Sequence, residues 1–168
     1  MRNKHFQGFT LIELLIVVAI ISVLAALAVV AFKPLARFQD SRNAQRWSDV
    51  VAIVKALKLY QVDHDGNLPD TVQSLTAGLY YQIGEGGNVC NDPCYNPTVV
   101  LQTACVDLGI LAEEGYIASI PIDPNASGAS ADETRYYLAN TSSGTLIVGA
   151  CNEEQGSNSS VQPIEVSY

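Results

Sequence analysis

A run of 24 residues, Phe9 to Phe32, is almost entirely apolar. Glu13 is its only charged residue, and Thr10 and Ser22 are its only other polar residues. An α-helix rises about 1.5 Å per residue, so such a helix spans roughly 36 Å, enough to cross a hydrocarbon core of about 30 Å. The run therefore predicts a membrane-spanning helix and excludes an ordinary soluble protein.

A short basic segment precedes this run. Met1–Gly8 contains Arg2, Lys4 and His5, which is typical of the cytoplasmic flank of a first membrane span. The alternative is a cleaved secretory signal, whose small-residue cleavage site the alanines in the run could imitate. Such a signal has a hydrophobic region of about 7 to 15 residues, shorter than this run. We therefore favour an anchor.

The carboxylate of Glu13 requires an explanation. An ionised carboxylate at the centre of a membrane helix costs about 2.5 to 3.5 kcal/mol on insertion scales, and less near a helix end. The simplest interpretation is that Glu13, five residues past Gly8, reaches the lipid headgroups and has no other role. The residues around it favour a second interpretation.

The segment Gly8-Phe9-Thr10-Leu11-Ile12-Glu13 resembles the processing site of type IV pilins and type II secretion pseudopilins, in which a dedicated peptidase cuts after the glycine. The basic leader and the apolar run C-terminal to the cut agree with this resemblance. It implies cleavage between Gly8 and Phe9, methylation of the new amine of Phe9, and pairing of Glu13 with an adjacent subunit's N-terminus. Residues four apart share a helix face, so this amine and carboxylate are able to neutralise each other.

A second helical pattern follows the apolar run. Apolar residues recur at three- and four-residue spacing with charged residues between them, as in an amphipathic helix packed on one side. We expect a long helix from Phe9 to about Val62, with Pro34 as a candidate kink because proline lacks an N–H donor. The apolar members of the pattern are Trp47, Val50, Val51, Val54 and Leu57.

The residues after this helix predict a helix stop and no calcium site. Asp63–Asp70 alternates oxygen donors, but Leu68 and Ser74 stand where an EF-hand loop needs Gly and Glu. Gly66 is able to take a left-handed conformation, and Pro69 prevents continuation of the helix.

The remainder predicts a small α+β head, with an antiparallel sheet covering the second half of the long helix. The expected parts are a leader at 1–8, a membrane or filament-core helix at 9–32, an amphipathic half at 33–62 and the head at 63–168. Within the head we expect a surface loop at Thr71–Pro97, a helix from Leu101 to Ala112, an extended segment at Tyr116–Pro124, strands at Arg135–Ala139 and Thr145–Cys151, and an edge strand at Val161–Val166.

Four cysteines, Cys90, Cys94, Cys105 and Cys151, all lie in the predicted head. They lack the paired Cys-x-x-Cys spacing of a zinc ribbon. An oxidising exterior favours two disulfides and no metal. Sequence alone leaves all three pairings open.

The sequence offers little for catalysis. His5 and His64 are the only histidines, and no nucleophile elbow or phosphate-binding glycine loop is present. The adjacent glutamates Glu113–Glu114 and Glu153–Glu154 are expected to be solvated charge. We therefore predict neither an enzyme nor a cofactor.

Charge is divided unevenly along the chain. Met1–Lys58 carries eight basic and three acidic residues, whereas Leu59–Tyr168 carries one basic residue and fourteen acidic ones. An acidic head repels phosphate backbones, so we expect it to bind no nucleic acid. Two alternatives remain for the basic residues after the apolar run: they meet the acidic head of another subunit, or they are solvated near the headgroups. These residues are Lys33, Arg37, Arg42 and Arg46.

Together these features predict a structural subunit of an extracellular type IV pilus-like filament. The resemblance implies a prepilin peptidase, a cytoplasmic assembly ATPase, an inner-membrane platform and other copies of the chain in a helical filament as partners. It also implies a single-pass protein of the cytoplasmic membrane that later stands on the cell surface with its head outside.

Two alternatives remain. The first is a type II secretion pseudopilin. Major pseudopilins typically carry a C-terminal run of aspartates and glycines that holds calcium, and Ser142–Tyr168 contains no aspartate, which favours a pilus. The second, from another class, is a single-pass membrane-anchored binding protein, whose tether tolerates loss of Glu13.

Overall fold

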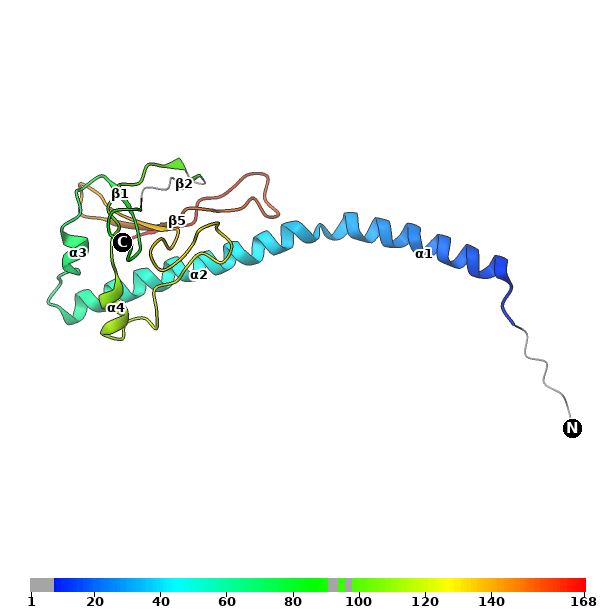
Figure 1. Ribbon diagram of the computed structural model, residues 1–168, viewed down its shortest axis with the longest axis horizontal. Helices are drawn as coiled ribbons and strands as arrows, with labels where there is room; N and C mark the ends of the chain where they lie inside the picture. Colours follow the sequence, from blue (N-terminus) through cyan, green and yellow to red (C-terminus); the bar gives the residue numbers. More distant parts are fainter. Residues whose placement is uncertain (1–7, 91–93, 96–97) are drawn as a thin grey trace, which may run out of the picture. The chain divides into compact units, whose positions relative to one another are not determined.

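The computed structural model describes residues 8–90, 94–95 and 98–168 (Figure 1). The predicted leader, apart from Gly8, lies outside the described residues. The chain divides into a first unit that ends at Leu35 and a second unit, Ala36–Tyr168. The elements are α1 (Leu11–Phe32), α2 (Pro34–Asp63), α3 (Asp70–Gln73), β1 (Tyr80–Gln82), β2 (Cys94–Tyr95), β3 (Thr98–Val99), α4 (Gly109–Glu113), β4 (Tyr136–Asn140), β5 (Leu146–Ala150) and β6 (Glu165–Ser167).

Helix α1 buries none of its residues within the chain. Thr10 caps its N-terminus, and the hydroxyl of Ser22 donates to the Val18 carbonyl at 2.7 Å, so this polar group is satisfied inside the helix. At 22 residues α1 is about 33 Å long. It is therefore long and apolar enough to cross a membrane, as judged from length and composition.

The predicted long helix is interrupted at a single residue. Lys33 separates α1 from α2 and has a left-handed backbone, with φ 42° and ψ 61°. Pro34 takes the first position of α2, where its missing N–H costs nothing and its fixed φ suits the helix. Pro34 thus begins α2, and the predicted long helix is interrupted beside the residue that was expected to kink it.

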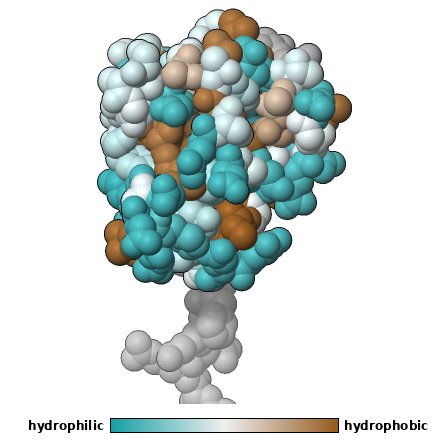
Figure 2. Space-filling model, turned by 90° about the vertical axis from the view of Figure 1, so that its left-hand side faces the viewer, coloured by the Kyte–Doolittle hydropathy of each residue, from teal (hydrophilic) through white to brown (hydrophobic). Residues whose placement is uncertain are grey.

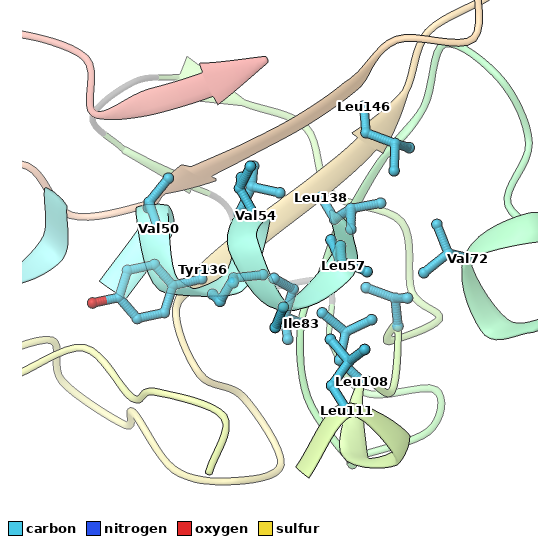
Figure 3. Packing of buried hydrophobic residues seen from close by; sticks show 14 of the residues in the cluster. Val50, Val54, Leu57, Val72, Ile83, Leu108, Leu111, Tyr136, Leu138 and Leu146 are labelled. Carbon is cyan, nitrogen blue, oxygen red and sulfur yellow. The ribbon is translucent and has the colours of Figure 1, made fainter. Parts of the chain in front are cut away.

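Helix α2 packs one face against the four-stranded sheet. Val50, Val54 and Leu57 lie beside Tyr136 and Leu138 of β4 (Figure 3). Fully burying an apolar side chain of this size stabilises the fold by about 1.5 to 3 kcal/mol. The buried residues of α2 are Arg46, Asp49, Val50, Ile53, Val54, Ala56 and Leu57.

Trp47 does not belong to this buried face, although the sequence placed it there. It is 48% exposed, whereas Ile53 is fully buried. The two positions are about 120° apart around a helix of 3.6 residues per turn, so they cannot both point into the core. Trp47, at the N-terminal end of the predicted stripe, was therefore wrongly assigned to the buried face, whereas Leu57 at its other end is buried.

The sheet has the strand order β1-β4-β5-β6, and every neighbouring pair is antiparallel. The predicted hairpin is confirmed as β4 and β5, closed by a hydrogen bond from the Thr141 N–H to the Thr145 carbonyl at 2.8 Å. The predicted edge strand is confirmed as β6, which begins after Pro163 and not before it. The α+β architecture, with a helix packed on a small antiparallel sheet, is confirmed.

Strand β4 is buried on both faces. Tyr136 and Leu138 face the core under α2, and Tyr137 belongs to a smaller cluster with Leu101 and Cys151 on the other side. Gly149 makes room for Tyr137, because a Cβ at this position would lie 2.4 Å from the tyrosine ring.

Two predictions for the head are wrong. Thr71–Pro97 is not one long loop, since β1 and β2 lie within it and α3 overlaps its start. The helix expected from Leu101 to Ala112 is reduced to Gly109–Glu113. Leu101 instead forms a β-bridge with Tyr80, and Val106 one with Ile83, so pairing with the edge of the sheet overrides the helical spacing.

The segment Tyr116–Pro124, which was expected to be extended, contains no strand. The N–H of Asp123 nevertheless donates to the Thr134 carbonyl at 3.0 Å, which anchors the end of the segment.

Hydrophilic groups cover most of the head where α2 ends, and apolar groups form separate patches there (Figure 2).

Candidate processing and assembly site

Gly8 and Phe9 lie just before α1 in an irregular, exposed segment. Phe9 is 89% exposed. No described residue lies within 4 Å of the place that a Cβ would take at Gly8, and Gly8 does not have a positive φ. Within the described part of the chain, nothing therefore requires glycine at this position, and the segment is exposed.

Glu13 closes a capping box at the start of α1. Its carboxylate accepts hydrogen bonds from the backbone N–H and the hydroxyl of Thr10, both at 2.8 Å. In return, the N–H of Glu13 donates to the Thr10 hydroxyl oxygen at 3.2 Å. Two groups that a helix start leaves without partners are thereby satisfied, and the carboxylate lies at the positive end of the helix dipole.

This geometry bears on the predicted pairing of Glu13 with the amine of Phe9. Phe9 lies outside the helix, because the cap is Thr10 and α1 begins at Leu11. In the uncut chain the carboxylate binds the amide of Thr10, the residue that follows Phe9. Cleavage after Gly8 would create the amine on Phe9, one residue before this hydrogen bond. The Glu13 carboxylate is thus already held close to the position of the new amine, and its pairing with that amine stays a prediction.

The second unit contains a buried ion-pair network that sequence analysis did not identify. Arg46 on α2 donates from Nε to Asp123 Oδ2 at 2.7 Å and from Nη2 to Asp123 Oδ1 at 3.0 Å. A third donor, Nη1, contacts Glu154 Oε2 at 2.9 Å. Arg42 also binds Glu154, with Nε 2.6 Å from Oε2.

These contacts bear on the two alternatives for the basic residues after the apolar run. Arg42 and Arg46 pair within their own chain, so neither alternative from the sequence holds for them. Lys33 and Arg37 remain exposed. The expectation that Glu154 is solvated charge is also wrong, because it receives both arginines.

Hydrogen bonds set the charge states in this network. Burial opposes the charge of Arg46, but the hydrogen bonds to Asp123 and Glu154 outweigh it and raise the pKa of the guanidinium. The hydrogen bond from Arg42 holds the pKa of Glu154 below its ordinary value. These shifts favour the charged forms of Arg46 and Glu154. Asp123 also accepts the backbone N–H groups of Asn125 and Ala126.

Further contacts attach the C-terminal polar loop to α2. Asn43 Nδ2 donates to the Glu154 carbonyl at 2.6 Å, and the Ser157 N–H donates to Asp40 Oδ1 at 2.8 Å. The polar loop Glu153–Ser160 is thus attached to the first half of α2.

Glu153 is buried, which corrects the expectation that it is solvated. It is 2% exposed, and its Oε1 accepts the N–H of Ile164 at 2.9 Å. Its Oε2 has no hydrogen-bond partner among the described residues. Burial raises the pKa of this carboxyl to about 7, against a partial opposing effect of the Ile164 N–H.

The four cysteines form two disulfides, as predicted. The pairs are Cys90–Cys105 and Cys94–Cys151. The second bond joins β2 to the residue after β5, 57 positions further along. In residues 8–90, 94–95 and 98–168 no group of three or more His, Cys, Asp or Glu side chains is arranged to hold a metal ion.

A signal for the ion-pair network was present in the sequence. Arg46 and Asp49 lie seven and four positions before the buried residue Ile53, so the helical spacing places all three on the same face of α2. A charged residue on the buried face of an amphipathic helix requires a partner. The identity of that partner, Asp123, carries no such signal because it comes from a loop 77 residues away.

Comparisons with known proteins agree with this site. The family model for the prokaryotic N-terminal methylation motif matches residues 3–29. Type II secretion system core protein G from Aeromonas hydrophila is 30% identical over 124 residues, which cover 74% of this chain and 71% of the relative. The same-named protein of Pseudomonas aeruginosa is 29% identical over the same shares, and that of Escherichia coli is 30% identical over 70% of this chain and 66% of its own.

The capped apolar helix, the methylation motif and the helix-on-sheet head define a pilin-like filament subunit. The chain belongs to the type IV pilin-like family, which includes the core protein G relatives of the type II secretion system. No solved structure matches the chain significantly.

Proposed function

We propose that this protein is a pseudopilin of a type II secretion system, a structural subunit that assembles into a filament. Its role is mechanical and not catalytic. The proposal favours the alternative from the sequence analysis over the pilus subunit that the missing C-terminal aspartates suggested.

One observation carries the proposal. The similarity to core protein G extends over 124 residues, whereas the methylation motif spans only residues 3–29. Most of the aligned residues therefore lie outside the motif, C-terminal to it. A shared membrane signal alone would not produce a match of this length.

The mechanism follows from the exposed surface of α1. A helix with no buried residue needs an apolar environment along its whole length, which lipid supplies before assembly and neighbouring α1 helices supply afterwards. Glu13 is the exception. In this mechanism it leaves its own Thr10 cap, or shares it, to neutralise the Phe9 amine of an adjacent subunit.

Processing and location follow from the same proposal. A prepilin peptidase removes the leader 1–8, and residues 9–32 span the cytoplasmic membrane as a single pass. Residues 33–62 and the head 63–168 lie outside, where the two disulfides form in an oxidising environment. An assembly ATPase and an inner-membrane platform then extract the subunit into a helical filament of identical chains.

The pilus subunit remains a second candidate because of a specific observation. Ser142–Tyr168 contains no aspartate, and side chains of α2 hold the Glu153–Ser160 loop. Deletion of the gene separates the candidates: loss of exoproteins from the medium with normal surface pili supports the pseudopilin, and the reverse result supports the pilus.

The assembly role is tested with Glu13→Leu. We expect this variant to insert into the membrane normally but to be absent from sheared filaments, because the charge that seats the neighbouring amine is gone. Ser22→Ala is the matched control, since it removes a polar group from α1 that is already satisfied within the helix. Normal amounts of Glu13→Leu in filaments would refute the role and favour a tethered binding protein.

A further inference from the structure

Helix α2 carries an unpartnered stripe on the side opposite its buried face. We call Trp47, Val51, Lys55, Lys58 and Val62 the outer stripe. Their spacing of four, four, three and four residues places them along one line of an α-helix. Trp47 is 48% exposed and Val62 78% exposed. Val51 is partly buried, and the other four residues present two apolar groups and two cations to the outside of the head.

The cations of the outer stripe are largely uncommitted. Lys55 makes no ion pair with any residue in the described part of the chain, and Lys58 Nζ only lies 4.9 Å from the centroid of the Tyr168 ring. No acidic residue belongs to the stripe. An exposed tryptophan favours an interface, because tryptophan is enriched at interfaces and at their hot spots. Lys55 adds a charge that is able to select an acidic partner surface.

A second, separate surface has the opposite charge. A cleft of about 400 Å³ opens between α4, the turn after β1 and the loops on either side of Asp123. Leu108, Ala112 and Ile120 contribute its apolar lining, and the exposed carboxylates Glu85, Asp107 and Glu113 stand at its edge. No lysine or arginine lines it, and none of its residues comes from α2.

We propose that this acidic cleft receives the outer stripe of a second copy of the chain, with Trp47 against the apolar lining and Lys55 beside the carboxylates. The inference rests on the proposed filament function and deepens it. A second copy is the occupant that the charges favour, because the basic and acidic surfaces complement each other and every copy carries both.

The geometry of such a contact suits a filament. The two surfaces share no residue, so a subunit engaged through its cleft still offers its outer stripe to the next one. A heterologous contact of this kind does not satisfy itself in a dimer, and it propagates as an open helical assembly when the rotation does not close. The heads would then add directional contacts to the packing of the α1 helices.

Trp47 supplies a probe that needs no mutation, because it is the only tryptophan of the chain. We compare its fluorescence in sheared wild-type filaments and in detergent-solubilised subunits. Docking predicts a blue-shifted emission and several-fold weaker quenching by acrylamide in the filament. Equal quenching in both states overturns the proposal, since Trp47 would then stay exposed to water.

Charge reversal identifies the partner surface. Lys55→Glu is expected to lower the amount of subunit in filaments by roughly tenfold, because it places like charges together. Combining it with Glu85→Lys or Glu113→Lys restores assembly in at least one of the two double variants. Asp70→Lys on α3, outside both surfaces, changes the charge by as much as Glu85→Lys or Glu113→Lys. It is the control for these cleft variants and is expected neither to rescue Lys55→Glu nor to impair assembly by itself.

The outcomes separate this inference from the proposed function. All variants are first checked for leader removal and two disulfides, so that a misfolded chain is not scored. Absence of wild-type filaments contradicts the function itself. Wild-type filaments together with normal assembly of Lys55→Glu, or with rescue by neither cleft variant, overturn the docking alone. If the cleft variants Glu85→Lys and Glu113→Lys formed normal filaments but lost secretion, the cleft would bind another partner. This result would also overturn the docking of the outer stripe.

Discussion

The guanidinium of Arg46 donates two hydrogen bonds to the carboxylate of Asp123, and both side chains are almost completely inaccessible to water. This pair joins α2 to a loop 77 residues further along the chain. Taking two charges out of water costs several kcal/mol for each ion, and their attraction offsets this only when the remaining hydrogen-bonding groups are satisfied. Asn125 and Ala126 satisfy Asp123, and Glu154 satisfies Arg46.

Removing one member of this pair is expected to be severe. Asp123→Ala leaves the Arg46 charge buried with half of its hydrogen bonds, so we expect the free energy of unfolding to fall by about 3 to 5 kcal/mol. Urea denaturation of the detergent-solubilised protein measures it. Glu114→Ala, at a half-exposed carboxylate near His64, is the control and should cost about 1 kcal/mol or less. Equal losses in the two variants would contradict the role of the buried pair.

The sequence predicted the parts of the fold that local pattern determines. The apolar run gives α1, and the two apolar segments on either side of the polar stretch Asn140–Gly144 give the β4–β5 hairpin. The stop after α2 was also visible, and Gly66 adopts the left-handed φ of 88° that the sequence suggested. Each of these features depends on residues within a few positions of one another.

Features that depend on distant contacts were missed. The spacing from Leu101 to Ala112 fits a helix, but Leu101 and Val106 pair with the β1 region instead. The adjacent glutamates Glu153 and Glu154 look solvated in sequence, yet one is buried and the other receives two arginines. A local pattern cannot report a partner that folding brings from more than a hundred residues away.

The two disulfides should differ in their effect on stability. Cys94–Cys151 closes a loop of 57 residues and Cys90–Cys105 one of 15. Chain entropy predicts that the free energy of unfolding falls by about 4 kcal/mol without Cys94–Cys151 and by about 3 kcal/mol without Cys90–Cys105. The double alanine variant at Cys94 and Cys151 should therefore unfold at a lower urea concentration than the double alanine variant at Cys90 and Cys105. Intact mass without reductant supplies the control: four alkylatable thiols in protein isolated from outside the cell would contradict both bonds.

Glu153 should make stability depend on pH. Its pKa rises from an ordinary value of 4.5 to about 7 in the folded state. Between these values the folded chain keeps a proton that the unfolded chain has lost, so the free energy of unfolding falls as the pH rises through this window. Arg46 and Glu165 act on the carboxyl in opposite directions but leave burial dominant.

Glu153→Gln tests this dependence while keeping an acceptor for the Ile164 N–H. We expect it to raise the free energy of unfolding at pH 8 by about 1 to 3 kcal/mol and to change little at pH 4, where the native carboxyl is already protonated. Denaturation at both pH values measures the difference. Glu114→Gln, at a half-exposed site, should show no such dependence, and an equal gain at pH 4 and pH 8 would rule out titration as the cause.

The mature N-terminus is the most direct prediction. We expect native protein to begin at Phe9, with an added methyl group on its amine, as top-down mass spectrometry will show. Gly8→Val should leave unprocessed precursor in the membrane, because a β-branched side chain crowds the bond that the peptidase cuts. The space around Gly8 is open, so this variant is not expected to disturb the fold of the chain itself. Gln7→Ala serves as the control for a change beside the cut. A native N-terminus at Met1 or beyond Ala25 would contradict processing at Gly8 and with it the carboxylate–amine pairing through which Glu13 acts.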